Sequence, residues 1–456
     1  MTRKNIRCEH GYLTTMRPPS SAWEDICRSA VKRKTILMVL CGLACVPFAH
    51  AQNPAVDAAF AAAPFQQWIA QGPKAELPWH SRISAPALTL HQRMAVRVEV
   101  ELDGNELVAR CCEGKAVALV AITDQQGHTY RNFGEKDLKD ATAGLGQYMI
   151  SLSWEVFLLP GDYKATIAFY YSGRSAHNLI SERVHVAPLK HDPLPGSWRD
   201  LPTVEFCDSQ PEGLDAFLLP NIEGRLRLPA ISSRPIHVEI LENLTPYQSE
   251  RRRPKLYTDR LAVFLPILKT FSQLEVQNGT VDLSVLDFAR RSVIFDQQNI
   301  KDRGVAWTKF RDAMSANSVV LVDAHDLERE HDYGQFFGSE MTRLLNAAES
   351  IPAKRVVIVI SGPMELGSRK SIEIAAPTES NFAVFYVRCD FLLQAPLVVR
   401  SPILGGPIGP PPQRLEALED GVGKALRKLR PRIFGAQSAE GVRQALATIL
   451  SELSGM

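Results

Sequence analysis

The fold of the carboxyl-terminal half is decided by one apolar run, Val356-Val357-Ile358-Val359-Ile360. A strand with apolar residues at every position belongs in a sheet that is covered on both faces. On either side of this run, segments with helical periodicity alternate with further short apolar strands. This alternation predicts an α/β domain with a doubly wound sheet over residues 235–456.

One pair of expected strands departs from a purely parallel arrangement. Only Ala289-Arg290-Arg291 separate the strands expected at residues 281–288 and 292–296. A parallel crossover needs about a dozen residues or more, so these two strands must form an antiparallel hairpin. The other expected strands are residues 236–241, 319–322 and 383–387. The expected helices are residues 259–273, 306–314, 336–349, 415–429 and 439–453.

The amino-terminal half carries a different periodicity. Residues 88–187 alternate apolar and polar side chains in period two, which predicts an antiparallel β-sandwich. The turn Pro160-Gly161-Asp162-Tyr163 resembles the corner before a late strand of immunoglobulin-like sandwiches, where the tyrosine hydroxyl ties a loop to the core. Residues 52–87 are expected to be a helical or irregular lead-in. Residues 188–234 contain many prolines and are expected to be a connector.

The order of elements in the second domain resembles that of von Willebrand factor A-type domains, over roughly residues 235–455. In that family a metal ion is held by Asp-x-Ser-x-Ser after the first strand, a threonine from a later loop, and an aspartate after a later strand. Here Asn243 and Thr245 stand in the places of the first Asp and Ser, while Tyr247 replaces the last Ser. Ser361-Gly362-Pro363 stands where the family usually has Thr-Asp-Gly.

These departures remove the carboxylates from the family's metal site. A hard divalent cation needs oxygen ligands, and carboxylates offset much of the cost of dehydrating it. Only neutral donors remain at the matching positions, so we predict no functional metal site there and no cofactor. Magnesium or manganese binding near Asn243 would contradict this prediction.

A leader with a secretory signal peptide is expected over residues 1–51. Lys32-Arg33-Lys34 precedes a 14-residue apolar stretch, and Ala49-His50-Ala51 follows it. This order predicts a signal peptide over about residues 31–51 that is cleaved after Ala51. Fourteen residues are too few to span a bilayer, so a retained anchor is the weaker alternative. Cleavage after Ala51 is the expected processing of the leader, and lipidation of Cys45 is the second-ranked alternative.

Removal of the leader changes the charge of the chain. The whole sequence has 52 Lys and Arg against 50 Asp and Glu, and residues 52–456 keep 44 against 47. We therefore expect a mildly acidic protein in the periplasm, at the cell surface or secreted, without the clustered basic surface that nucleic acid requires. Residues 1–30 are unusual before a signal peptide, so the true start is expected downstream, near Val31.

Four cysteines remain after the leader, namely Cys111, Cys112, Cys207 and Cys389. An exported protein meets conditions that permit disulfides, and adjacent cysteines rarely bridge each other. A bridge from Cys111 or Cys112 to Cys207 is therefore the first pairing to test, with free buried thiols as the open alternative. No C-x-x-C is present, which argues against zinc-ribbon and thioredoxin chemistry.

The stretch from Asp323 to Asp332 concentrates two histidines, His325 and His331, and five carboxylates. It follows an expected strand, at the kind of strand end where α/β sheets place ligands. The spacing matches neither H-E-x-x-H nor its inverted form, so a solvated loop is favoured over a metal or catalytic site. The sequence has no G-x-S-x-G, Walker A or G-x-G-x-x-G motif.

The leading hypothesis is a non-enzymatic exported binding protein that engages another protein at the carboxyl ends of its α/β sheet. The residues expected at that face are Asn243, Thr245, Asp323 and Ser361. One alternative is an exported hydrolase that uses the loop from Asp323 to Asp332. A second alternative is a structural component of an envelope assembly.

Overall fold

The computed structural model describes residues 53–109, 114–138, 149–207, 222–245, 254–288, 290–317, 333–346, 353–367, 372–375, 382–391 and 420–456. The chain divides into two compact units, Met1–Asp57 and Ala58–Met456. The leader, with Cys45 and the expected cleavage after Ala51, lies outside the described residues, so export stays a prediction. Within the described ranges, no helix has both the length and the apolar character needed to cross a membrane.

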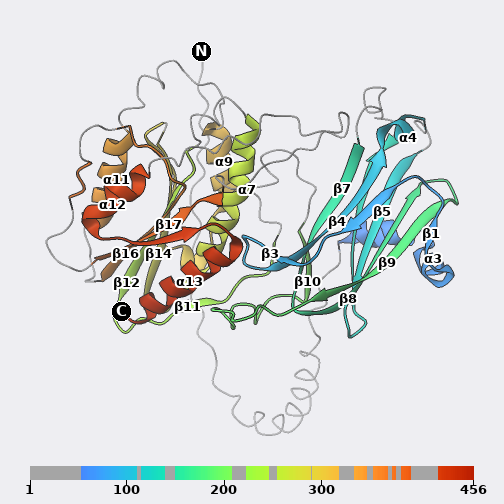
Figure 1. The fold of residues 1–456 in the computed structure, drawn as a ribbon, viewed down its shortest axis with the longest axis horizontal. Helices are drawn as coiled ribbons and strands as arrows, with labels where there is room; N and C mark the ends of the chain where they lie inside the picture. The colour runs from blue at the N-terminus through green and yellow to red at the C-terminus, as the bar shows by residue number, and fades with distance from the viewer. Residues whose placement is uncertain are drawn as a thin grey trace, which may run out of the picture. The chain divides into compact units, whose positions relative to one another are not determined.

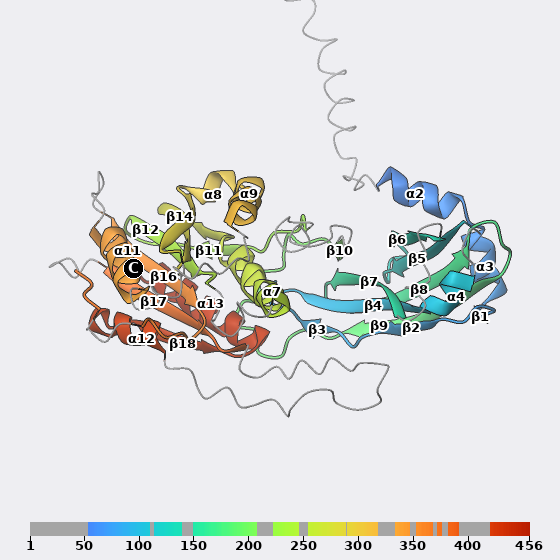
Figure 2. The ribbon, with the colours of Figure 1, turned by 90° about the horizontal axis from the view of Figure 1, so that it is seen from above.

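Two antiparallel sheets form a β-sandwich in the amino-terminal half (Figures 1 and 2). One sheet has the strand order β1-β9-β8-β5-β6, and the other has the order β10-β7-β4-β2, with β3 also paired to β4. The strands are β1 (Lys74–Ala75), β2 (His80–Ile83), β3 (Ala87–Leu88), β4 (Met94–Asp103), β5 (Lys115–Thr123), β6 (Thr129–Asp137), β7 (Met149–Leu158), β8 (Gly161–Tyr171), β9 (His177–Val186) and β10 (Val204–Cys207). Three short helices belong to this half, α2 (Pro54–Ala61), α3 (Phe65–Gln71) and α4 (Gly104–Ala109).

The period-two pattern produces the core of the sandwich. Val98 and Val100 of β4 are fully buried, as are Val120 of β5 and Ile167 of β8, and all four belong to one hydrophobic core between the two sheets. The side chain of Tyr163 is buried as well, and its hydroxyl donates to the carbonyl oxygen of Leu159 at 2.8 Å. The expected tie between this tyrosine and its turn is therefore present.

The sandwich extends beyond the predicted limits of residues 88–187. Strand β1 pairs with β9 and β2 pairs with β4, so part of the expected lead-in belongs to the two sheets. Strand β10, which lies in the expected connector, pairs with β7. All three are short strands at sheet edges, where few ladder hydrogen bonds are needed and nearby prolines are tolerated. Such strands leave little periodicity in the sequence.

A six-stranded sheet with the order β15-β14-β12-β16-β17-β18 forms the second domain. Its strands are β12 (Ile236–Asn243), β14 (Gly279–Asp287), β15 (Ser292–Gln297), β16 (Lys354–Ser361), β17 (Phe382–Cys389) and β18 (Arg432–Ala436). The β14–β15 pair is antiparallel, which confirms the expected hairpin, and every other pair in this sheet is parallel. A separate parallel pair joins β11 (Leu228–Ala230) to β13 (Leu274–Val276). The strand expected at residues 319–322 lies outside the described residues.

Helices cover both faces of this sheet (Figure 1), as the apolar run in β16 predicts. Val356 and Ile358 face a core that includes residues of α7, α9 and α13, whereas Val357 and Val359 face residues of α11 and α12. The helices are α7 (Pro254–Phe271), α8 (Ile300–Arg303), α9 (Trp307–Asn317), α11 (Tyr333–Asn346), α12 (Gly421–Leu426) with the 3-10 turn η5 (Arg427–Leu429), and α13 (Ala439–Ser454).

One buried arginine of α13 holds the proline-rich connector. The guanidinium of Arg443 donates to both carboxylate oxygens of Asp192 at 2.7 and 2.8 Å. It also donates to the carbonyl oxygen of Leu194 and the hydroxyl of Ser197, and it lies 4.8 Å from the ring centre of Trp198. The connector is thus anchored to the second domain by a charge-assisted, bidentate contact.

Candidate functional site

The order of strands reverses between β12 and β16, which lie side by side in the sheet although β14 and β15 separate them in sequence. In open α/β sheets, ligands bind outside the carboxyl ends of the strands at such a reversal. Strand β12 ends at Asn243 and β16 ends at Ser361. The structure therefore brings two of the residues expected from the sequence to this place, and we call it the switch-point edge.

The polar side chains of the switch-point edge bind one another. The amide nitrogen of the Asn243 side chain donates to the Ser361 hydroxyl at 2.9 Å and approaches the sulfur of Met364 at 3.0 Å. The side-chain oxygen of Asn243 accepts from the backbone N–H of Thr245 at 2.9 Å, and the Thr245 hydroxyl accepts from the N–H of Phe288 at 2.6 Å. Asn243, Thr245 and Ser361 are all at most 2% exposed.

This hydrogen bonding limits the chemistry of the switch-point edge. The Thr245 N–H can only donate, so the Asn243 atom that faces it is the oxygen, and the NH₂ group must point at Ser361. A cation would meet that NH₂ group and a thioether rather than converging carboxylates. Asp323, the fourth expected residue, lies outside the described residues, as does the rest of the loop to Asp332. The prediction of a ligand face built from these four residues stays a prediction.

A charged group that was not among the residues expected from the sequence lies at the carboxyl end of the neighbouring strand β17, where Arg388 is the penultimate residue and Asp390 follows the strand. Arg388 donates to Asp390 at 3.1 Å and lies 3.8 Å from a carboxylate oxygen of Asp420. Asp420 also accepts from the hydroxyl of Tyr386 at 3.0 Å and from the N–H of Gly423 at 2.8 Å, where it caps α12. Because one arginine lies between two carboxylates, this group joins the end of β17 to α12 and carries a formal net charge of −1.

A second polar group lies toward the amino ends of β12 and β14, and we call it the His–Glu–Asp cluster. It consists of His237, Glu239 and Asp282, which present one ligand atom each within 4.8 Å of one another. The Nε2 atom of His237 is 3.6 Å from Oδ2 of Asp282 and 4.0 Å from Oε2 of Glu239. The pairing of β12 with β14 places Glu239 beside Asp282 in register, and the period of the strands puts all three side chains on one face.

Burial and like charges shape the protonation of this cluster. Burial is the largest of several causes that together raise the pKa of Glu239 to about 7. The charges of Asp282 and Asp296 act in the same direction, and the hydrogen bond from Ser284 opposes them. The pKa of Asp296, on β15, is also raised, mainly by burial. A carboxylate with a pKa near neutrality can exchange a proton under ordinary conditions, so this is the described site where acid–base or cation chemistry is best supported.

The sequence does contain a signal for this cluster, which lies within a strand and not at a strand end. His237 and Glu239 alternate with Val238 and Ile240 in a strand that was expected to be buried on both faces. Two ionisable side chains at i and i+2 of a central strand must share one face and must find polar partners there. The partner Asp282 could not be identified without the register of β12 and β14.

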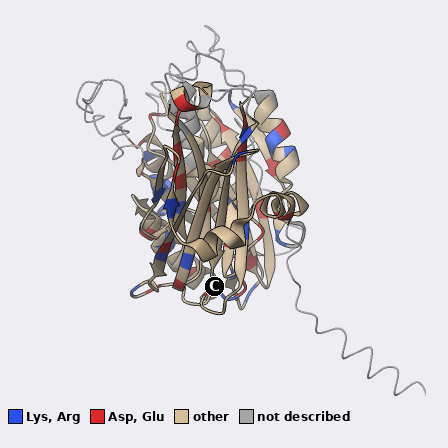
Figure 3. Cartoon of the chain, turned by 90° about the vertical axis from the view of Figure 1, so that its right-hand side faces the viewer, with Lys and Arg blue, Asp and Glu red and all other residues tan. Residues whose placement is uncertain are grey.

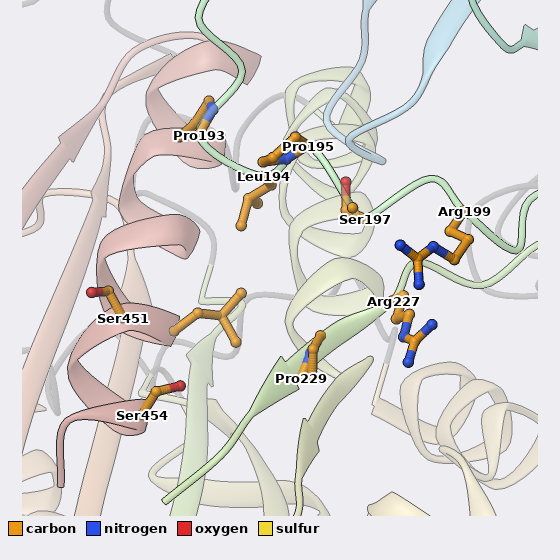
Figure 4. A pocket seen from close by; sticks show the side chains of 11 residues that line it. Pro193, Leu194, Pro195, Ser197, Arg199, Arg227, Pro229, Ser451 and Ser454 are labelled. Carbon is orange, nitrogen blue, oxygen red and sulfur yellow. The ribbon is translucent and has the colours of Figure 1, made fainter.

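A surface pocket of about 400 Å³ lies between the connector and α13 (Figure 4). Its lining is largely apolar, with two arginines, Arg199 and Arg227, at one side. Figure 3 shows basic and acidic positions interspersed along the described strands that face the viewer. Cys207 ends β10 in a partly buried position, while Cys111 and Cys112 lie outside the described residues, so the expected disulfide stays a prediction.

Comparisons with known proteins add little to this geometry. No protein-family model matches the chain, and no curated protein matches its sequence. Among solved structures, the chain is similar to a family 123 glycoside hydrolase from Clostridium perfringens at 8% sequence identity and a TM-score of 0.20. The match covers 69% of this chain and 72% of that chain. A likeness this distant carries no argument about fold or activity.

Proposed function

We propose that this chain is an exported, non-enzymatic protein-binding protein, in which an immunoglobulin-like sandwich precedes a von Willebrand factor A-like domain. Two observations support the family resemblances. The sheet of the second domain has an antiparallel edge strand beside parallel strands, and the sandwich has a tyrosine whose hydroxyl holds the preceding turn. Fold resemblance alone is a weak warrant for function, so the proposal depends on the site.

The observation that carries the proposal is the composition of the switch-point edge. This is the place where α/β sheets present ligands, and the side chains of Asn243, Thr245 and Ser361 there are neutral and held by hydrogen bonds. A buried, satisfied network of this kind holds a surface in a fixed shape, because its donors and acceptors are already used within it. We infer that the edge acts by presenting a fixed surface to a protein partner. The hydrolase hypothesis depends on His325 and His331, which lie outside the described residues.

A site-specific crosslinking experiment tests this proposal. A photoreactive amino acid would replace Glu365 or Arg291, two exposed residues that follow the carboxyl ends of β16 and β14. The matched control is Gln277, which is exposed at the amino end of β14. The full chain with its leader would be expressed in cells that export it and then irradiated.

We expect one discrete protein adduct from Glu365 or Arg291 and none from Gln277. Adducts of the same size from all three positions would mean that contact is unselective, and adducts only from Gln277 would place the partner at the other edge. Either result, or no adduct at any position, contradicts the proposal. Cell fractionation of the same samples tests export, because a chain that is found uncleaved in the cytoplasm contradicts the predicted leader.

A further inference from the structure

The His–Glu–Asp cluster differs from an ordinary group of surface carboxylates because each of its side chains is held by a second contact. In every case one polar atom of the side chain has a partner, and the other polar atom points toward the centre of the cluster. The three supporting contacts are His237 Nδ1 to the Thr280 hydroxyl at 2.7 Å, Glu239 Oε1 to the Ser284 hydroxyl at 2.7 Å, and Asp282 Oδ1 to the Asn299 N–H at 2.8 Å.

This arrangement has the form of a metal site with its supporting shell. A histidine that binds a metal usually makes a hydrogen bond through its other ring nitrogen, which fixes the tautomer and orients the ring. Ligating carboxylates are held in the same way. The atoms left at the centre are Nε2 of His237, Oε2 of Glu239 and Oδ2 of Asp282, one nitrogen and two oxygens.

The distances at the centre fit a small cation after a modest movement. Ligands about 2.0–2.1 Å from a tetrahedral Zn²⁺ lie about 3.3 Å apart. Nε2 of His237 is 3.6 Å from one carboxylate oxygen and 4.0 Å from the other, and the three ligand atoms all lie within 4.8 Å of one another. Closure to about 3.3 Å therefore requires the ligand atoms to approach by at most about 1.5 Å. Both carboxylates are acceptors and repel each other, and a cation between them removes that repulsion.

The charge around the centre also favours a cation. Four carboxylates interact here, those of Glu239, Asp282, Asp296 and Glu340, against the single guanidinium of Arg343. Arg343 is itself hydrogen-bonded to Glu340 at 2.8 Å. Glu239 is only 5% exposed, so its charge is poorly solvated and gains most from a bound cation.

We propose that the His–Glu–Asp cluster binds one divalent first-row transition-metal ion, with Zn²⁺ as the best fit. His237, Glu239 and Asp282 supply three ligands, and solvent completes the coordination on the side where His237 and Asp282 are partly exposed. The imidazole ligand favours Zn²⁺ over Mg²⁺ or Ca²⁺, which prefer oxygen alone. This site lies in the amino half of β12 and goes beyond the proposed function, which depends on the switch-point edge.

The opposing interpretation is a metal-free ion pair in which a protonated His237 bridges the two carboxylates. The two interpretations predict different outcomes when the metal-free protein is titrated with Zn²⁺. Full-length mature protein would be stripped with a chelator and titrated with Zn²⁺ alone against a chromophoric competitor at neutral pH. We expect one equivalent of Zn²⁺ to bind, with millimolar Mg²⁺ failing to displace it.

Matched variants locate the binding. His237→Ala and Asp282→Asn should each weaken Zn²⁺ binding by at least about tenfold, and Thr280→Val, which removes only the support of His237, by about tenfold. Glu340→Gln is the control, because it removes a charge from the same field without removing a ligand, and it should change the affinity by less than about threefold. Circular dichroism would verify that each variant is folded.

Absence of Zn²⁺ binding by the folded wild-type protein would overturn the proposal in favour of the ion pair. Unchanged binding in His237→Ala would also overturn it, since the metal would then be held elsewhere in the chain. An equal loss in Glu340→Gln and in Asp282→Asn would show a diffuse effect of charge rather than coordination.

Discussion

Replacing Asn243 by aspartate tests the chemistry of the switch-point edge most directly. The Asn243→Asp variant keeps the shape of the side chain but removes the NH₂ group that donates to Ser361 at 2.9 Å. It also places a carboxyl group at a position that is 2% exposed and near the sulfur of Met364. The contact with the Thr245 N–H survives, because a carboxylate still accepts there.

Two limiting cases bound the loss of unfolding free energy that Asn243→Asp should cause. Loss of one buried hydrogen bond costs about 1–3 kcal/mol when the partner is left unsatisfied. The new carboxyl group can instead take up a proton and donate to Ser361, and protonating an ordinary aspartate at pH 7 costs about 4 kcal/mol. We therefore expect the unfolding free energy at pH 7 to fall by about 1–4 kcal/mol.

The pH dependence follows from the sign of the expected shift. Burial raises the pKa of the new carboxyl group above its value in the unfolded chain, so the folded variant binds more protons than the unfolded chain at intermediate pH. The deficit relative to wild type is then largest at pH 7 and shrinks as the pH falls toward 4. Urea unfolding of Asn243→Asp and wild type at pH 7 and pH 5 measures both quantities.

Asn278→Asp is the control for this experiment, because Asn278 is exposed and the substitution adds the same charge at the other end of the sheet. We expect it to change stability by less than about 0.5 kcal/mol. Equal stability of Asn243→Asp and wild type at pH 7 would refute the reasoning. Binding of millimolar Mg²⁺ or Mn²⁺ near Asn243 in the wild-type protein would refute the prediction that this edge cannot hold a cation, whereas rescue of Asn243→Asp alone would agree with it, because the variant restores a carboxylate.

Two further predictions concern other parts of the chain. Arg443→Ala should lower the unfolding free energy by about 3–5 kcal/mol in urea titrations, because it leaves the carboxylate of Asp192 without its bidentate partner. Arg443→Lys keeps the charge and should lose less, so equal losses would contradict this account. Burial, together with the nearby charges of Lys269 and Arg93, lowers the pKa of the half-buried His91 to about 3, so the unfolded chain binds a proton that the folded chain does not. Stability should therefore fall by up to about 2 kcal/mol between pH 7 and pH 5, and a His91→Gln variant that keeps the full slope would contradict the assignment.

The parts of the fold that could be predicted from sequence are those in which local spacing leaves one solution. The three residues between the second and third strands of the α/β domain allow only a hairpin, and the unbroken apolar run of β16 requires cover on both faces. Strand β18 was missed because it lies at the sheet edge, is largely exposed and includes Gly435, so it has no clear period. Strand β10 was hidden among prolines for a similar reason.

The candidate sites differ in how much of them the sequence contains. Asn243 and Ser361 could be placed together because both follow expected strands, and the carboxyl ends of parallel strands meet at one edge. His237, Glu239 and Asp282 could not be placed together, since Glu239 and its partner in register are 43 positions apart in the sequence, and only the pairing of β12 with β14 brings them together. Sequence reasoning favoured strand ends and therefore overlooked polar residues within strands.

The switch-point edge and the His–Glu–Asp cluster belong to the same sheet, but their buried polar atoms are stabilised in opposite ways. At the switch-point edge, the neutral side chains of Asn243 and Ser361 use their donors and acceptors in hydrogen bonds within the protein. A partner that binds there gains no charge interaction from these side chains and must recognise the shape of the surface. In the His–Glu–Asp cluster, carboxylates are crowded around one imidazole, and their repulsion is relieved only by a proton or a cation. Because each group has its own set of hydrogen bonds, Asn243→Asp should leave Zn²⁺ affinity unchanged and His237→Ala should leave crosslinking at Glu365 unchanged. A shared loss in either variant would mean that β12 transmits one site's state to the other, and the two proposals would then describe a single site.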